Sequence, residues 1–73
     1  MPAKHYAVFT EDGLHNPYHS TETAMQEVNL LNSSGVEAYI GWATNPEVFD
    51  EISDVIRTSG RPLVQVIADW GWM

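Results

Sequence analysis

The pattern of apolar and polar residues predicts an amphipathic helix over Asn45–Gly60. Its apolar residues recur at three- and four-residue spacing and form one stripe, which consists of Val48, Phe49, Ile52, Val55 and Ile56. Asn45 can cap the start of this helix, Pro46 suits its first position, and Gly60 can adopt the left-handed conformation that ends it. We therefore expect one face of this helix to pack on a core.

The same period predicts a second helix over Ser20–Asn32. Either Ser20 or Thr21 can cap it, and Gly35 follows its end. The residues expected to form its buried stripe are Ala24, Met25, Val28 and Leu31.

Alternating patterns predict strands in the remaining segments. Lys4–Thr10 and Val36–Trp42 alternate with period two, and the second segment places Val36, Ala38, Ile40 and Trp42 on its core face. The Asp12-Gly13 turn leads into Leu14–Tyr18, where Pro17 permits only an edge strand or a loop. Arg61–Ala68 is apolar on both faces apart from Gln65, which predicts a central strand.

The order of these elements predicts one α/β domain over residues 1–73, with α+β character. We expect a small two-layer sandwich in which a mixed sheet of three or four strands carries two helices on one face. The other face would then be partly uncovered, with Tyr39, Trp70, Trp72 and Tyr6 as its exposed aromatic residues. Alternatively, the C-terminal tryptophans fold back over the sheet and complete the core.

Composition narrows the class of protein. The chain has 73 residues and no cysteine, so disulfides and thiolate–metal sites cannot stabilise it. No apolar run reaches the length of a membrane span, and the first residues lack the apolar core of a signal peptide. These features predict a soluble cytoplasmic domain.

The charge balance is strongly acidic. Ten Asp and Glu residues face three Lys and Arg residues, which gives a formal net charge of −7. Such a field repels nucleic acids and anionic membranes and attracts basic surfaces. Direct binding of nucleic acid or membrane is therefore not expected.

Four of the acidic residues form a second stripe on the Asn45–Gly60 helix: Glu47, Asp50, Glu51 and Asp54. Like-charge pairs four residues apart each destabilise a helix by roughly 0.2–0.5 kcal/mol. The stripe is either a solvated helix face or a surface kept acidic to meet a basic partner. In the second case it could imitate part of the phosphate track of a nucleic acid, although its charges are sparser than the phosphates.

Motifs for catalysis or cofactor binding are weak. His15 and His19 are four residues apart, but Pro17 between them argues against the helix that would make them a zinc-binding pair. The sequence has no Gly-x-Ser-x-Gly elbow and no glycine-rich phosphate loop. We expect a non-enzymatic protein without a metal or cofactor.

In its small size, acidity, lack of cysteine and lack of a catalytic motif, the chain resembles small phage-encoded anti-defence inhibitors, including anti-CRISPR proteins. The resemblance is one of general character and transfers no residue roles. It implies an inhibitor that binds a basic, nucleic-acid-binding defence protein. The expected contact residues are the four acids together with Tyr39, Trp70 and Trp72. The alternative is a structural or assembly subunit that dimerises through the aromatic sheet face.

Overall fold

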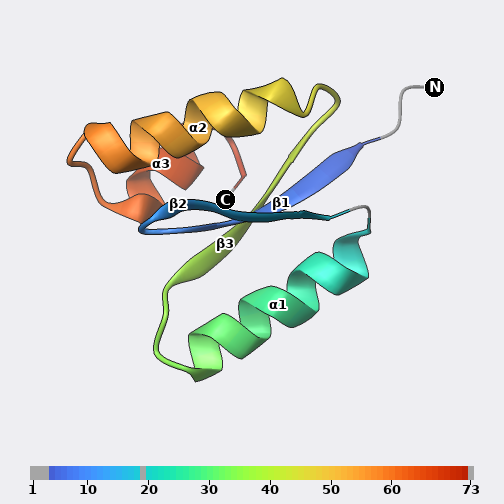
Figure 1. Cartoon of the computed structure of the whole chain (residues 1–73). Helices are drawn as coiled ribbons and strands as arrows, with labels where there is room; N and C mark the ends of the chain where they lie inside the picture. The colour runs from blue at the N-terminus through green and yellow to red at the C-terminus, as the bar shows by residue number, and fades with distance from the viewer. Residues whose placement is uncertain (1–3, 19, 73) are drawn as a thin grey trace.

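Three strands and three helices occupy the part of the chain that the computed structural model describes, residues 4–18 and 20–72 (Figure 1). The strands are β1 (His5–Thr10), β2 (Gly13–Tyr18) and β3 (Ala38–Ala43). The helices are α1 (Thr21–Ser33), α2 (Glu47–Thr58) and α3 (Leu63–Asp69).

The sheet has the order β2-β1-β3, and both neighbouring pairs are antiparallel. β1 and β2 form a hairpin in which Thr10 lies opposite Gly13, whose φ of 103° is the left-handed conformation that the turn requires. β2 and β3 run in the same direction and are connected by α1, but β1 lies between them. The mixed sheet expected from the sequence is therefore wrong, because no two parallel strands are neighbours in the described sheet.

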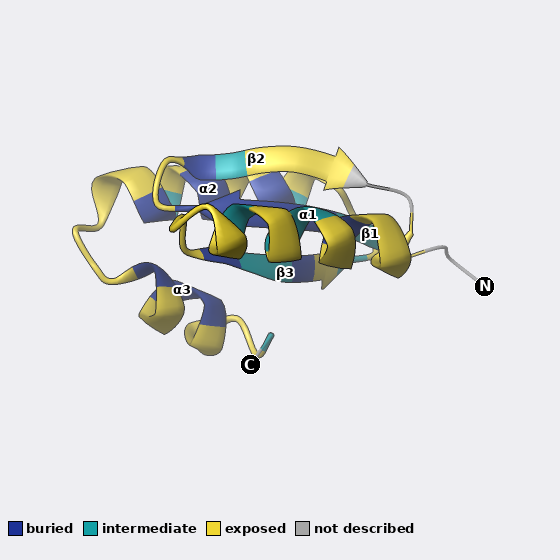
Figure 2. Ribbon diagram, turned by 90° about the horizontal axis from the view of Figure 1, so that it is seen from below, coloured by how far each residue is buried: buried dark blue, intermediate teal, exposed yellow. Residues whose placement is uncertain are grey.

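Helices cover both faces of the sheet, so the fold has three layers and the predicted two-layer arrangement is wrong (Figure 1). Ala7 and Phe9 of β1 pack against α2 and α3, whereas Val8 packs against α1. All three residues have no exposed surface. Because both faces of β1 are apolar, a helix on only one face would have left one of them in water. In Figure 2, seen from the α1 side, the dark blue β1 lies between β2 and β3 and is partly hidden by α1, whose outer side is exposed.

The segment predicted as the last strand is helix α3, so that prediction is wrong. Leu63, Val66 and Ile67 are buried at the spacing of one helix face, and the residues between them are exposed. The segment is rich in β-branched residues, but this propensity is weaker than the packing of a helical stripe.

The predicted start of α1 at Ser20 is confirmed, whereas α2 begins one residue later than predicted, with Pro46 at the capping position. The Ser20 hydroxyl accepts a hydrogen bond from the Thr23 N–H at 3.3 Å, and the Asn45 side chain accepts one from the Glu47 N–H at 3.1 Å. The buried stripe of α1 differs from its prediction at Met25, which is 52% exposed.

In the described part of the chain, none of the helices has the length and apolarity that a membrane crossing requires.

Candidate functional site

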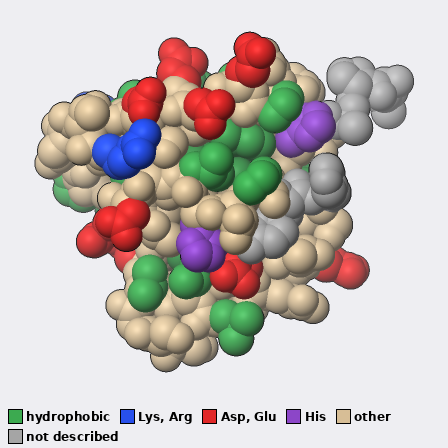
Figure 3. All heavy atoms as spheres, in the orientation of Figure 1, with side chains coloured by type: hydrophobic (Ala, Val, Ile, Leu, Met, Phe, Trp, Pro, Cys, Tyr) green, Lys and Arg blue, Asp and Glu red, His purple; other side chains and the backbone are tan. Residues whose placement is uncertain are grey.

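The outer face of α2 carries the acidic stripe predicted from the sequence. Phe49, Ile52 and Ile56 are at most 7% exposed, so they fix the side of α2 that faces the sheet. The opposite side therefore points to solvent, and all four acidic residues, Glu47, Asp50, Glu51 and Asp54, are exposed. Figure 3 shows acidic side chains gathered over α2.

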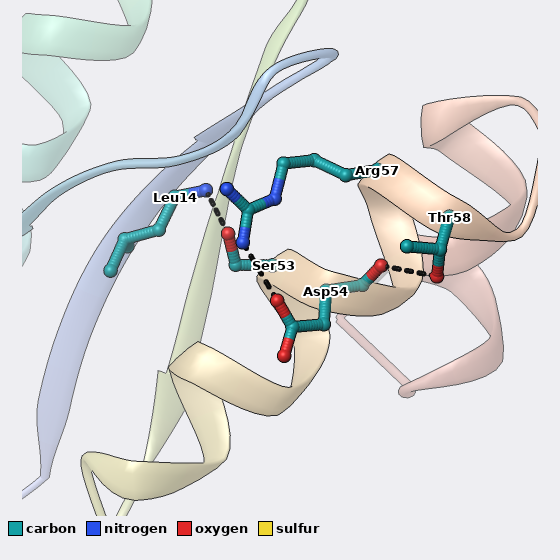
Figure 4. Close-up of polar contacts among 5 residues, drawn as sticks. All are labelled: Leu14, Ser53, Asp54, Arg57 and Thr58. Carbon is teal, nitrogen blue, oxygen red and sulfur yellow. Dashed lines mark hydrogen bonds and ion pairs between the residues drawn. The ribbon is translucent and has the colours of Figure 1, made fainter.

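Most of this negative charge is not neutralised by the protein. Asp54 pairs with Arg57 at 2.7 Å (Figure 4), and their side chains are 70% and 57% exposed. Such an exposed pair contributes little to stability. Within residues 4–18 and 20–72, no basic side chain forms an ion pair with Glu47, Asp50 or Glu51. We call these four residues the acidic face of α2.

The β1–β2 hairpin lies against the second half of α2. The buried Ser53 hydroxyl accepts a hydrogen bond from the Leu14 N–H at 2.9 Å (Figure 4). This contact brings the turn residues Glu11 and Asp12 to the same end of the molecule as Asp54. A shallow hollow of about 260 Å³ continues from the turn and is lined by Thr10, Glu11, Asp12, Gly35, Val36 and Glu37. Of these residues, Glu11 and Asp12 at the turn add negative charge next to α2.

The C-terminal tryptophans lie elsewhere, beside β3. The Trp72 ring stacks on Phe9 with centroids 5.5 Å apart and an interplanar angle of 19°. It covers Gly41, where any β-carbon would collide with the indole ring. Trp70 in turn stacks on Trp72 at 6.2 Å and stays 41% exposed. The alternative in which the tail folds over the sheet is therefore confirmed for Trp72, and the uncovered aromatic sheet face is absent from the described structure.

Tyr39 packs against the same core cluster as Trp72 and is half-buried. Its hydroxyl donates a hydrogen bond to the Glu37 carboxylate at 2.9 Å. This hydrogen bond, with smaller effects from burial and from the Glu37 charge, raises the pKa of Tyr39. The structure thus groups the predicted contact residues in two places, the acids on α2 and the aromatics beside β3.

Trp42 is an exposed aromatic residue that the sequence placed in the core. It is 44% exposed, and the Lys4 ammonium lies 4.6 Å from its ring centroid. Trp42 points to the α1 side of β3, as do the buried Ala38 and the half-buried Ile40. The signal for its exposure is its position, because the strand ends at the next residue, Ala43.

The histidine pair does not form a described site. The His15 ring lies 3.0 Å from the Glu27 carboxylate of α1, and His19 falls outside the described residues. In residues 4–18 and 20–72, no three ligand-type side chains come together in an arrangement that could hold a metal ion.

No protein-family model matches this chain, and neither the curated proteins nor the solved structures include a significant match to it.

Proposed function

We propose that this chain is a non-enzymatic interaction module whose acidic face of α2 binds a basic surface on a partner protein. The partner class that fits is a nucleic-acid-binding protein, which the module would inhibit by occupying its nucleic-acid site. One observation carries the proposal: Glu47, Asp50 and Glu51 are exposed together on one rigid helix face without an ion-pair partner among the described residues.

Self-repulsion along α2 supports this proposal. Glu47 and Glu51 lie one helical turn apart, as do Asp50 and Asp54, and each like-charge pair destabilises α2 by roughly 0.2–0.5 kcal/mol. A lysine at one position of each pair would reverse the sign of this interaction. A basic partner would gain long-range attraction from the arrangement as it stands, which mainly raises the association rate.

The geometry also limits how far nucleic-acid mimicry extends. The helix rises ~1.5 Å per residue, so Glu47 to Asp54 spans ~10 Å, where duplex DNA carries about six phosphate charges. Four carboxylates on α2 are fewer, and Glu11 and Asp12 at the neighbouring hairpin turn add two more, with the Arg57 side chain lying against the same turn. The proposed mimic therefore covers α2 and this turn.

Trp70 is the aromatic residue best placed to add affinity. Exposed tryptophans held rigidly by the surrounding structure are frequent binding hot spots, and Trp72 supports the Trp70 ring from one side. Trp72 and Tyr39 then act as supports, because they are already packed on the core. The resemblance to phage-encoded anti-defence inhibitors makes a bacterial defence protein in the cytoplasm the first partner to test.

The test compares two variants with the same formal charge. Asp50→Asn/Glu51→Gln removes two charges from the acidic face of α2, and Glu22→Gln/Glu37→Gln removes two exposed charges from elsewhere. Proteins from a bacterial extract that bind a duplex-DNA column are incubated with each tagged variant. The unmodified chain should capture a basic protein that added duplex DNA displaces, and only the Asp50/Glu51 variant should lose it.

Equal loss in both variants would show that net charge, and not the acidic face of α2, drives capture. Capture that neither variant affects would leave the stripe as a solvated helix face and would contradict the proposal. Circular dichroism of each variant verifies that it is folded before the comparison.

A further inference from the structure

We propose that the outer edge of β3 pairs with the same edge of a second copy, which gives a closed two-fold dimer with a continuous six-stranded sheet. This interface is separate from the acidic face of α2. It also differs from a dimer formed through a sheet face, because helices cover both faces of the described sheet.

The outer edge of β3 offers unpaired backbone groups. In an antiparallel pair, alternate residues point their N–H and C=O groups toward the neighbouring strand and away from it. The Ala38 N–H donates to the Asn32 side chain at 3.2 Å and therefore points away from β1. By the alternation, Ile40 and Trp42 point the same way. Among the described residues, neither of them forms a hydrogen bond on this outer side.

The opposite edge of the sheet, β2, is closed to such pairing. The outward Leu14 N–H already donates to the Ser53 hydroxyl of α2 at 2.9 Å (Figure 4). Pro17 lies opposite Ala7, which bonds to β3, so Pro17 also faces outward and has no N–H to offer. A β-bulge interrupts the ladder between these two positions. With one open edge per chain, association ends at two copies and does not continue into a fibre.

β3 is complementary to itself in the antiparallel direction. With Gly41 on the two-fold axis, Ile40 of one copy lies opposite Trp42 of the other, and each pair exchanges two hydrogen bonds. The exposed Trp42 ring would then pack across the Ile40 side chain of the other copy. Residues 38–46 carry no charge, so no like charges meet along the joined strands. The Ile40–Trp42 pairs on both sides of the axis match only when β3 meets its own sequence, so the proposed occupant is a second copy.

The net charge of −7 does not prevent this pairing, because α2 crosses the sheet to the opposite edge at β2, where Ser53 contacts the hairpin and the next residue is Asp54. Glu47 begins α2 four residues after the end of β3 and is the acid of this face nearest to the joined strands in the sequence. In the dimer, β2 of one copy and β2 of the other are five strand spacings apart, or ~24 Å at ~4.8 Å each. This distance exceeds the Debye length of ~8 Å at physiological ionic strength, so the repulsion is largely screened.

The experiment measures mass against concentration by sedimentation equilibrium. The unmodified chain should reach twice its mass of 8.2 kDa. Trp42→Lys places a charge on the edge and removes the cross-strand packing, and we expect it to weaken dimerisation at least ~10-fold. Leu30→Lys is the matched control, because it adds the same charge at a side chain that is 64% exposed on α1. This control should dimerise like the unmodified chain.

Hydrogen exchange of single amides then locates the interface. The Ile40 and Trp42 amides should be protected in the dimer, and the Ile40 amide should exchange rapidly in monomeric Trp42→Lys. A chain that stays monomeric at millimolar concentration would overturn the proposal. So would a dimer in which the Ile40 and Trp42 amides exchange rapidly, or in which Trp42→Lys and Leu30→Lys dimerise equally.

Discussion

At the scale of single residues, the hydrogen bond from Tyr39 to Glu37 links stability to pH. The Glu37 carboxylate accepts a hydrogen bond from the Tyr39 hydroxyl at 2.9 Å, which favours the protonated phenol and raises the pKa of Tyr39 above its ordinary value of 10.0. In the unfolded chain Tyr39 has no such partner. The folded state therefore holds this proton more tightly than the unfolded state.

Because the pKa of Tyr39 is higher in the folded state, its ionisation in alkali should lower the free energy of unfolding. A raised pKa in the folded state contributes stability that is fully present below pH 10.0 and is lost as the pH rises through the folded pKa. Urea unfolding from about pH 8 to about pH 12 should show the unmodified chain losing more stability than Tyr39→Phe, which has no phenol to ionise. Parallel curves for the two proteins would show that the Tyr39–Glu37 contact does not persist in solution.

The contrast between Trp70 and Trp72 shows what sequence reasoning misses at this scale. Both residues belong to one short aromatic tail, and their composition fits either a core or an interface. What separates them is Gly41, whose missing side chain leaves room for the Trp72 ring to lie on Phe9. Gly41 is 31 positions earlier in the chain, and no local pattern connects the two residues.

At the scale of elements, one substitution in α3 should change the free energy of unfolding in opposite directions if the segment is a helix or a strand. Ala68 is exposed on α3, where its side chain has few packing constraints. Ala68→Val should destabilise the protein by about 0.5 kcal/mol, because a β-branched residue loses rotamer freedom in a helix. In an exposed strand position the same change would stabilise. Urea unfolding measures whether the free energy of unfolding falls or rises. In the same series, Ala68→Gly should lower it by about 1 kcal/mol. A stabilising Ala68→Val would contradict the helix.

Strand β1, the hairpin turn and helices α1 and α2 were predictable because local signals agree there. Ser20 caps α1, the Asn45 side chain accepts a hydrogen bond at the start of α2, Gly13 supplies the turn, and the apolar stripe of α2 is buried as its spacing predicts. The α3 prediction failed because Val64, Val66 and Ile67 have strand propensity, whereas tertiary packing selects the helical set of Leu63, Val66 and Ile67. The acidic face of α2 followed from helical spacing alone. The open edge of β3 did not, because it depends on the strand order.

At the scale of the whole molecule, charge and open backbone lie on different sides. α2, with its acidic face, packs over β2, whereas β3 forms the other edge of the sheet with the exposed Trp42. The closed β2 edge and the open β3 edge follow from the same hydrogen-bond alternation. The acidic face of α2 and the outer edge of β3 are therefore different surfaces, and a dimer would present two acidic faces to its partners.

This separation predicts opposite salt dependences for the two contacts. Partner capture by the acidic face of α2 is electrostatic, so raising NaCl should weaken it. Pairing of β3 edges joins uncharged residues on molecules that each carry −7, so salt should screen the repulsion and strengthen dimerisation. Sedimentation equilibrium at low and high NaCl measures dimerisation, and the pull-down at the same concentrations measures partner capture.

If both contacts weakened with salt, the dimer interface would involve ion pairs and would have to lie away from the uncharged residues 38–46. If capture were insensitive to salt, the aromatic residues beside β3, and not the acidic face of α2, would carry the partner interaction.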